Sequence, residues 1–416
     1  MTLHVFNPEH DIALAANLEN FTSPHAGRQL RHDIGFLPAL WAGEGDRVLT
    51  DDAEAAAQSL HRLAVQARKH LRLQIIPRAT FIAGEGTLAA ADRVEPWGWD
   101  LALRAQLRRR GIADSVMPTD TLLADIRALS HRRTAARLMQ LLLDDGLDGI
   151  IGDIPAECQT AEEVEAALQR YGRAVIKAPW SSSGRGIRFI GTSKDAPLQG
   201  QNITLPPTTN APLQGQNIIL PSPPRVGLGV GLGTGILPWL RGVLARQGSV
   251  MVEPYYNKVK DLGMEFEALP DGSVRYCGLS LFHTANGQYT GNILATEQAK
   301  REMAGRYIPL TVLDNVRERI CHHLPTLLQG HYQGPLGVDM MVCNSPTSHS
   351  SPLTSHPPFL HPCVEINLRR TMGHAALSLT PADDDLVGVM RIEYRNDKSK
   401  ADITVSALPV LLSSAN

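Results

Sequence analysis

A segment that follows a strand–turn–strand pattern around a lysine constrains this chain more than any other. It is RAVIKAPWSSSGRGIRFI, Arg173 to Ile190. β-Forming residues alternate from Ala174 to Ala178, Pro179 ends that run, and apolar residues resume at Ile187 after a turn of small residues. The segment therefore predicts a β-hairpin with a glycine-rich tip.

The tip of this hairpin has the composition of an anion cradle. Glycine adopts positive φ at no steric cost and has no side chain, so backbone N–H groups at the tip can converge on a phosphate. Lys177 adds a positive charge one step before the turn. An ordinary flexible hairpin explains the same residues equally well. The segment is not a P-loop, because it lacks G-x-x-x-x-G-K-[ST] and does not open a helix. The candidate cradle residues are Ser182, Ser183, Gly184, Arg185 and Gly186.

Two later segments, Gly337–Val342 and Cys363–Asn367, are predicted strands that carry oxygen ligands. Side chains alternate along a strand with a period of two, so Glu365 and Asn367 share one face, and Asp339 can meet them from the other strand. Magnesium prefers oxygen ligands and is usually held by one or two carboxylates together with substrate phosphates. These residues favour a magnesium site over chance, with Val364 and Ile366 directed to the core.

The order of these motifs resembles the ATP-grasp superfamily over roughly Ser130 to His374. The motifs are the lysine hairpin, Val252-Glu253-Pro254-Tyr255, an aspartate on one strand and Glu-x-Asn on another. The resemblance implies that ATP and Mg²⁺ (or Mn²⁺) bind here, and that Lys177 and Arg369 are catalytic, with Arg369 holding the acid substrate. The metal ligands would be Asp339, Glu365 and Asn367. The nucleotide contacts would be Arg133 (of the pair Arg132 and Arg133), Lys177, the five cradle residues, Glu253, Tyr255, and Asp261 or Glu265.

The resemblance also implies an activity, namely an ATP- and Mg-dependent ligase that joins a carboxylate to an amine through an acyl phosphate. Its partners would be small-molecule acids and amines, and a homodimer is compatible with it. An ATP-grasp kinase that phosphorylates a small molecule, or an ATP-binding sensor without catalysis, are the alternatives. An intact set of candidate metal ligands argues against the sensor.

We expect an α/β fold in three parts. Residues 1–129 would form an α/β domain of the type that precedes ATP-grasp units, with a parallel sheet that includes strands at Leu3–Phe6, Arg47–Leu49 and Leu73–Ile76. Residues 130–380 would form a two-lobed ATP-grasp unit and 381–416 a C-terminal segment. Polar, Pro-rich insertions are expected at 192–225, where APLQGQN occurs twice, and at 344–362.

The loop after the first predicted strand has the sequence Asn7-Pro8-Glu9-His10-Asp11. Asn7 is expected to cap the helix that comes next, and Pro8 suits its first position. Ligands often dock beside such loops in α/β sheets. Helix capping does not need His10 or Asp11, so a smaller chance remains that these two contact substrate.

Composition narrows the class of partner. The formal net charge of −2 over 416 residues gives no electrostatic case for nucleic acid or an anionic membrane. Five scattered cysteines without a C-x-x-C pair suit a reducing cytoplasm, and the N-terminus lacks the pattern of a signal peptide.

Overall fold

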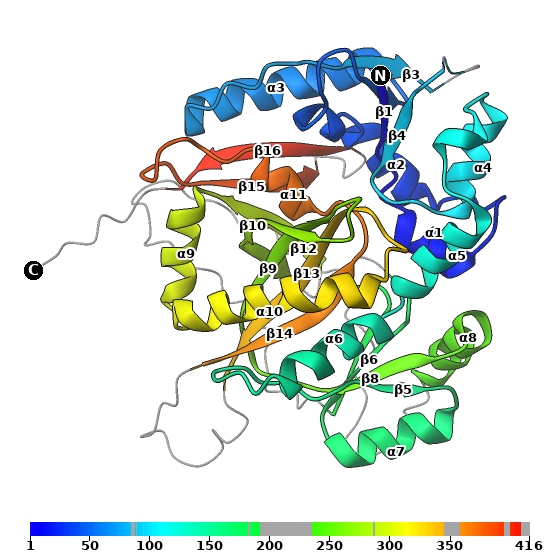
Figure 1. Cartoon of the computed structure of the whole chain (residues 1–416), viewed down its shortest axis with the longest axis vertical. Coiled ribbons are helices and arrows are strands. Elements are labelled where there is room, and N and C mark those ends of the chain that lie inside the picture. Colours follow the sequence, from blue (N-terminus) through cyan, green and yellow to red (C-terminus); the bar gives the residue numbers. More distant parts are fainter. Residues whose placement is uncertain are drawn as a thin grey trace, which may run out of the picture.

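The computed structural model describes residues 1–84, 88, 90–181, 184–191, 235–285, 288–344, 358–394 and 400–408. In these residues the strands form four sheets of four strands, with helices packed against them (Figure 1). One sheet is parallel and three are antiparallel. The predicted α/β class is confirmed.

The parallel sheet is built by the N-terminal residues in the strand order β3-β2-β1-β4. Its strands are β1 (Thr2–Val5), β2 (Arg47–Thr50), β3 (Thr80–Ala83) and β4 (Arg93–Pro96). The helices of this part are α1 (His10–Ala16), α2 (His25–Ile34), α3 (Ala53–Leu71), α4 (Leu101–Arg109) and α5 (Asp120–Leu129), with 3-10 turns at Leu37–Leu40 and Asp114–Val116.

The strand predicted at Leu73–Ile76 was wrong, because the third strand of the sheet is Thr80–Ala83. After α3, Arg72 takes a left-handed conformation with φ 52°, and the N–H of Leu73 still bonds the oxygen of Ala67 at 3.3 Å. Leu73 and Ile75 pack against the core without joining a β-ladder. The alternation of apolar residues in this segment therefore reflects side chains that pack on the core and does not indicate a strand.

A smaller antiparallel sheet carries the lysine hairpin. Its order is β5-β8-β6-β7, and β6 pairs antiparallel with β7 as predicted. Helices α7 and α8 cover one face, and α7 begins with the predicted capping box at Thr160. The elements are β5 (Ala156–Cys158), α7 (Ala161–Tyr171), β6 (Ala174–Lys177), β7 (Ile187–Ile190), α8 (Leu237–Gln247) and β8 (Val250–Pro254).

The large central sheet has the order β10-β9-β13-β14, and α6 and α10 pack on its apolar face. These elements are α6 (Arg133–Asp144), β9 (Lys258–Ala268), β10 (Val274–Ser280), α10 (Leu310–Leu328), β13 (Gly334–Cys343) and β14 (Phe359–Asn367). Strand β14 begins at Phe359, so residues 359–362 of the predicted insertion 344–362 are strand. The predicted insertion at 192–225 lies outside the described residues.

The fourth sheet, β11-β12-β15-β16, places the C-terminal strands against the N-terminal part of the chain. Its last strand lies beside α3 of the N-terminal part (Figure 1). Val405 and Ile403 share one apolar core with Leu60 and Leu63 of α3. The elements are β11 (Phe282–Ala285), β12 (Gln288–Leu294), α9 (Glu297–Gly305), α11 (Met372–Leu377), β15 (Gly388–Tyr394) and β16 (Ala401–Ala407). Domain boundaries at 129/130 and 380/381 stay predictions.

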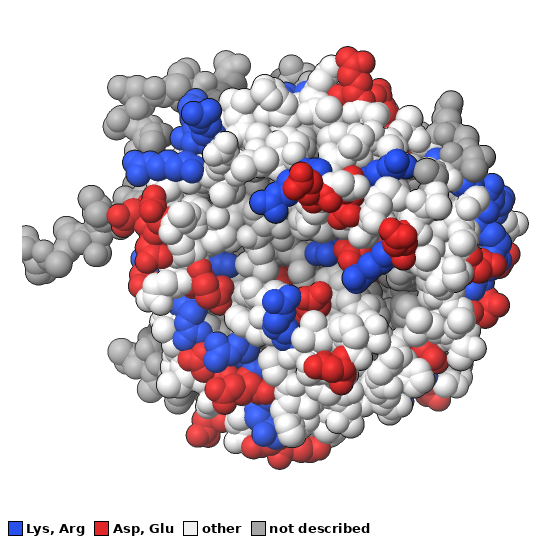
Figure 2. All heavy atoms as spheres, turned by 45° about the horizontal axis from the view of Figure 1, so that its top comes forward, with Lys and Arg blue, Asp and Glu red and all other residues white. Residues whose placement is uncertain are grey.

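Two surface features bear on the class of partner. Among the described residues no helix is both long and apolar enough to cross a membrane. On the face drawn in Figure 2, acidic and basic side chains are interspersed around a central hollow. The described residues of that face therefore show mixed charge and not the broad basic surface that nucleic-acid binding uses.

The loop Asn7–Asp11 is held by a buried polar network, and Asn7 does not cap α1 as predicted. The cap position is Glu9, which makes no capping side-chain bond. Asn7 instead clamps the backbone of Gly98, with Nδ2 donating to its oxygen at 2.8 Å and Oδ1 accepting from its N–H at 3.3 Å. His10 Nδ1 lies 3.3 Å from Asp100 Oδ2, and both side chains are almost fully buried. The loop is therefore fixed before any ligand binds.

Gly98→Ala tests this network. A Cβ at residue 98 would come within 2.6 Å of the buried His10 ring, so the ring or the loop must shift. We expect a loss of about 1–3 kcal/mol in the free energy of unfolding, measured by urea denaturation. Gly27→Ala is the control, because its Cβ would meet nothing closer than 3.5 Å and it lies inside α2. Equal stabilities for the two variants would contradict this packing of Gly98 on His10.

Candidate active site

The lysine hairpin brings a charge and a set of backbone donors to one end of the small sheet. Lys177 is the last residue of β6 and is 5% exposed. Its ammonium pairs with the Glu253 carboxylate of β8, which is also buried. The tip is closed by the N–H of Ala178 donating to the oxygen of Gly186 at 2.8 Å. A cation of this kind beside a closed hairpin tip suits an anionic ligand.

Glycine is required at two positions of the tip. Gly184 has φ 70°, in the left-handed region. A Cβ on Gly186 would clash with the Ser181 side chain. Arg185 follows Gly184 with an exposed side chain. The two remaining cradle candidates, Ser182 and Ser183, lie outside the described residues.

The structure places Arg132 in the site, whereas Arg133, the residue named from the sequence, lies elsewhere. Arg132 Nη1 is 2.8 Å from Glu365 Oε2, and its Nε donates to the oxygen of Ala178 at 3.0 Å. It thus bridges the small sheet and the central sheet. Arg133 pairs with Glu157 at 2.6 Å and is half exposed. The two successive residues point in different directions around the start of α6.

Strand register gathers the predicted metal ligands on one face of the central sheet. Asp339 of β13 lies directly opposite Glu365 of β14, and Gly337 lies opposite Asn367. On the other side of β13, Gly337 is opposite Glu265 of β9. Cross-strand neighbours of this kind share a face. A Cβ on Gly337 would lie 2.7 Å from Glu265 Oε2, so this glycine makes room for the carboxylate.

A chain of polar contacts runs from these ligands to the N-terminal loop. Asn367 Nδ2 donates to Asp339 Oδ2 at 3.1 Å, and Asn367 Oδ1 accepts from Arg369 Nη2 at 2.9 Å. Arg369 then donates to both oxygens of Asp11, from Nε at 3.0 Å and from Nη2 at 2.9 Å. This two-bond pair is the strong form of an arginine–carboxylate contact. The sequence offered Asp11 as a candidate for substrate contact, which stays a prediction, and the structure brings Asp11 next to the candidate metal ligands through Arg369.

Burial and neighbouring charges shift the pKa values of Asp339 and Asp11 in opposite directions. Burial, followed by the charges of Glu365 and Glu265, raises the pKa of Asp339 to about 8. Burial would also raise the pKa of Asp11, but the charge and hydrogen bonds of Arg369 outweigh it and hold that pKa below its usual value. The surroundings of Asp339 thus favour its neutral form, whereas Arg369 favours the charged form of Asp11.

The donor set at this place suits a hard divalent cation. It consists of the Asp339 and Glu365 carboxylates with the Asn367 amide, which are oxygen donors of the kind Mg²⁺ takes. Burial first, and the charges of Glu365 and Glu265 second, raise the pKa of Asp339, and a divalent cation at this place would lower it again. Within the described residues, no group of three or more His, Cys, Asp and Glu side chains has a metal-binding arrangement. The candidate site is therefore two carboxylates and an amide.

Glu265 and Asp261, the ribose candidates, lie in separate polar clusters on β9. Glu265 is 3% exposed and accepts from Thr371 Oγ1 at 2.8 Å, with His374 Nδ1 3.0 Å away. It lies close enough to affect the pKa of Asp339. Asp261 accepts from Lys258 Nζ and from Thr284 Oγ1, each at 2.6 Å. Glu265 therefore belongs to the carboxylate face of the sheet.

The hinge residue Tyr255 lies at the outer end of the small sheet. Its N–H donates to the oxygen of Arg173 at 2.9 Å, and the Arg173 guanidinium lies 4.5 Å from its ring centroid. Phe189 of β7 meets the same ring edge-on, with ring centroids 6.1 Å apart. Glu253 faces the other way, toward Lys177. Glu253 thus lies within β8 and faces Lys177, whereas Tyr255 follows the end of β8 and packs between Arg173 and Phe189.

The expectation that Val364 points to the core was wrong. Ile366 is 6% exposed in the central core, but Val364 is half-buried and lines a small cleft with Lys177 and Glu253. The register of β14 shifts between the Asp339 and Met341 pairs. Such a bulge breaks the simple alternation of side chains. Cys363 takes the core position instead.

A larger cleft of about 400 Å³ opens between α1 and α8 on the other side of the hairpin tip. Apolar side chains form much of its wall, among them Ile12, Trp180 and Trp239. Ser181, Arg185 and Gly186 belong to both the hairpin tip and the cleft. The predicted cradle therefore has open space on the side that faces α1.

Comparisons with known proteins give likenesses of overall arrangement. The sequence matches no protein-family model and none of the curated proteins compared with it. N5-carboxyaminoimidazole synthetase from Staphylococcus aureus, complexed with ADP, is 10% identical, with 98% of this chain and 93% of that chain covered and a TM-score of 0.44. A biotin carboxylase–β,γ-ATP complex from Campylobacter jejuni is 12% identical, with coverages of 94% and 75% and a TM-score of 0.44.

A third solved structure is N5-carboxyaminoimidazole ribonucleotide synthetase from Thermus thermophilus. It is 13% identical to this chain, with coverages of 94% and 83% and a TM-score of 0.40. Likenesses at these identities and TM-scores do not establish an activity. The function of this chain has to be inferred from its own residues.

The raised pKa of Asp339 predicts a pH effect on stability. The folded pKa of about 8 exceeds the usual 3.8, so the folded protein holds a proton that the unfolded chain has lost between these values. Stability should therefore fall as pH rises through this window in the metal-free protein. Asp339→Asn removes that loss, so its melting temperature should gain on the wild type between pH 5 and pH 8.5, measured in EDTA. A difference in melting temperature between variant and wild type that is the same at both pH values would contradict the prediction.

Proposed function

We propose that this chain is an ATP-grasp-type ligase that uses ATP and Mg²⁺ to join a carboxylate to an amine through an acyl phosphate. One arrangement of side chains supports the proposal. Lys177 and Arg132 lie beside the turn of the glycine hairpin, and Arg132 also pairs with Glu365, one of the carboxylates on the central sheet. Cations on one side and candidate metal ligands on the other suit a triphosphate between them.

The cationic side would hold the phosphates. Arg132 is 7% exposed, and its Nη1 lies 2.8 Å from Glu365 Oε2. A phosphate between the two sheets would share the charge of this guanidinium with Glu365. Lys177 is buried beside Glu253, so its charge is held in place and not spread over rotamers. Backbone donors near Gly184 and Gly186 would complete the cradle.

The carboxylate side would hold the cation. Asp339 and Glu365 would be its carboxylate ligands, and Asn367 would stay beside them, with Nδ2 donating to Asp339 and Oδ1 accepting from Arg369. When bound, Mg²⁺ neutralises phosphate charge and orients the γ-phosphoryl group. The cation would also offset the burial and the neighbouring carboxylate charges that raise the pKa of Asp339.

Arg369 would hold the acid next to this site. Its guanidinium is ordered by Asp11 and by Asn367, so it is fixed without substrate. In the reaction, an oxygen of the bound carboxylate attacks the γ-phosphorus, and the bond to the β,γ-bridging oxygen breaks to release ADP. The amine nitrogen then attacks the acyl carbon, loses a proton, and phosphate leaves. Positioning and charge supply the catalysis, so no protein nucleophile is needed.

Two further properties of the proposal concern context. The partners would be a small-molecule acid and amine, as predicted from the sequence. Cys158, Cys277, Cys321, Cys343 and Cys363 are all free thiols, which fits the cytoplasmic location expected from the sequence.

Glu365→Gln tests the cation site. The variant keeps shape and hydrogen bonding but loses charge, so ADP release with candidate acids and amines should fall about 100-fold or more, as for loss of one electrostatic stabiliser. The melting temperature should change little. Ile366→Asp is the control, since it buries a charge in the core and should unfold the protein. Unchanged turnover in Glu365→Gln would overturn the proposal. Mass spectrometry of the product separates an amide from a phosphate ester.

Lys177→Ala tests the phosphate cradle. Loss of the buried ammonium should weaken ATP binding by about tenfold or more, measured by calorimetry with Mg²⁺ and a non-hydrolysable ATP analogue. Lys258 is not a suitable control, because it begins β9 and pairs with Asp261 at 2.6 Å. Lys69 is exposed on α3 and is the better control. Equal affinities for Lys177→Ala and Lys69→Ala would place the phosphates elsewhere.

A further inference from the structure

We propose that the acid bound at this site is an α-amino acid, whose carboxylate binds Arg369 and whose ammonium binds Asp11. This inference deepens the proposed ligase function and rests on it. Its basis is the ion pair between Asp11 of α1 and Arg369, which joins residues 358 positions apart in the sequence.

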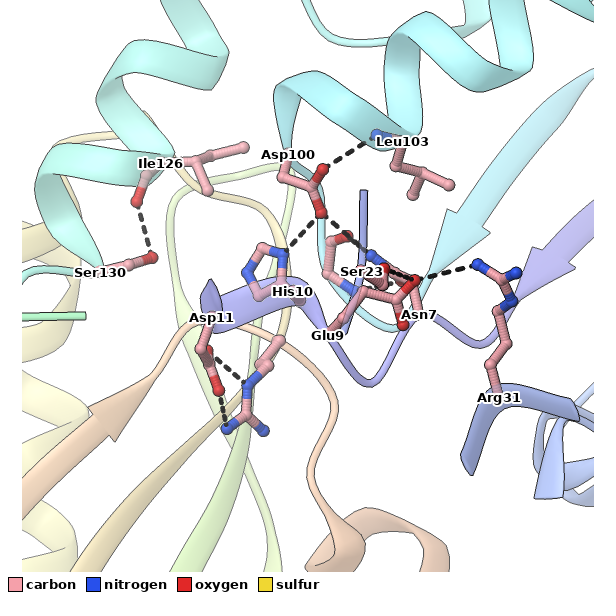
Figure 3. Close-up of polar contacts among 12 residues, drawn as sticks. Asn7, Glu9, His10, Asp11, Ser23, Arg31, Asp100, Leu103, Ile126 and Ser130 are labelled. Carbon is pink, nitrogen blue, oxygen red and sulfur yellow. Dashed lines mark hydrogen bonds and ion pairs between the residues drawn. The ribbon is translucent and has the colours of Figure 1, made fainter. Parts of the chain in front are cut away.

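Asp11 differs from the other polar residues of its loop in the direction of its side chain. Asn7 and His10 point to Asp100, and Glu9 accepts from Ser23 and Arg31 (Figure 3). These contacts stay within the N-terminal part. Asp11 points the opposite way, toward the central sheet (Figure 3). The network thus holds the loop so that one carboxylate is presented to the active site.

Charge balance then limits the kind of acid that can bind. Asp11 already occupies the fork of Arg369 with both of its oxygens. Nη2 also donates to Asn367 and Nη1 donates to the oxygen of Arg370 at 3.1 Å, so a carboxylate that binds through two N–H groups of Arg369 must displace one of these partners. Asp11, whose side chain is only 16% exposed, would then lose part of its compensating charge. Leaving a buried charge without its partner is strongly unfavourable.

An ammonium group on the same ligand removes this penalty. An α-amino acid carries its two charges on neighbouring carbons, so its carboxylate and ammonium can lie side by side along the Asp11–Arg369 pair. Each of the four charges would then have a partner of opposite sign. An acid without the amino group supplies only one of the two new contacts. Of the nearby cations, Arg132 also lies close enough to affect Asp11, but its Nη1 is paired with Glu365.

The arrangement also explains why Asp11 is an acid rather than an amide. Holding Arg369 in place could be done by any acceptor, and Asn367 already accepts from it at 2.9 Å. A full negative charge in addition makes the site selective for a cationic group. Asp11 would therefore determine specificity, while the adjacent carboxylates serve the cation.

The experiment measures ligand binding by the full chain with Mg²⁺ and a non-hydrolysable ATP analogue. The ligands are the twenty standard amino acids in both enantiomers, each with its deamino analogue, which is the same acid with hydrogen in place of the amino group. Thermal shift followed by calorimetry should find at least one amino acid that binds about tenfold or more tightly than its deamino analogue, as expected for an added charged contact. This comparison uses the wild type, so it does not depend on a variant that folds.

Asp11→Asn should abolish that preference, because the variant offers no negative charge to the ammonium group. The dissociation constants of the amino acid and its deamino analogue should then lie within about twofold of each other. Glu95→Gln is the matched control. Glu95 pairs with Arg370, the neighbour of Arg369, at 3.5 Å, and joins the same two parts of the chain. It should keep the preference. Loss of the preference in both variants would show a structural role for Asp11 and would overturn the inference.

Two other results would also overturn it, namely binding of deamino acids as tight as that of amino acids, or no binding by any amino acid of the panel. Failure of the ligase proposal would look different. An amino acid would bind with Asp11-dependent selectivity, but ATP with that amino acid and added amines would yield no ADP. The selectivity would then stand as the property of a binding protein.

Discussion

The antiparallel pairing of β9, β13 and β14 is the constraint on which the candidate site depends. Because side chains alternate along each strand, register alone decides that Asp339, Glu365 and Asn367 share a face, and that Glu265 joins them from β9. A shift of one residue would turn every one of these groups into the apolar core. The core beneath, built by α6 and α10 against the other face, holds the register. Packing energy thus indirectly maintains a row of acidic side chains at the cost of their burial.

Much of the site could be read from the sequence because its signals are local. The lysine strand followed by small residues is a local pattern, and the shared face of Glu365 and Asn367 follows directly from their spacing of two on a strand. The sequence could not choose between Arg132 and Arg133, since adjacent residues on a helix point about 100° apart and nothing local sets the helix rotation. It also missed the bulge in β14, where Val364 is half-buried and Cys363 lies in the core.

Contacts between distant segments lie beyond sequence reasoning of this kind. The role of Asp11 depends on Arg369, and that of Asn7 depends on Gly98, 91 positions away. Helix-capping rules explain Asn7 without any partner, and they led to the wrong answer here. The strand predicted at Leu73–Ile76 failed for a similar reason, because apolar alternation reports a buried face but not which backbone pairs with it.

The placement of β16 sets an order of events during synthesis of the chain. Asp33 of α2 accepts from the N–H of Ala401 at 2.7 Å, and Val405 covers apolar side chains of α3. These partners are separated by more than three hundred residues, and synthesis at about 5–20 residues per second leaves the N-terminal apolar face uncovered for tens of seconds. During synthesis the nascent chain therefore exposes an apolar surface of α3 until β16 has been made.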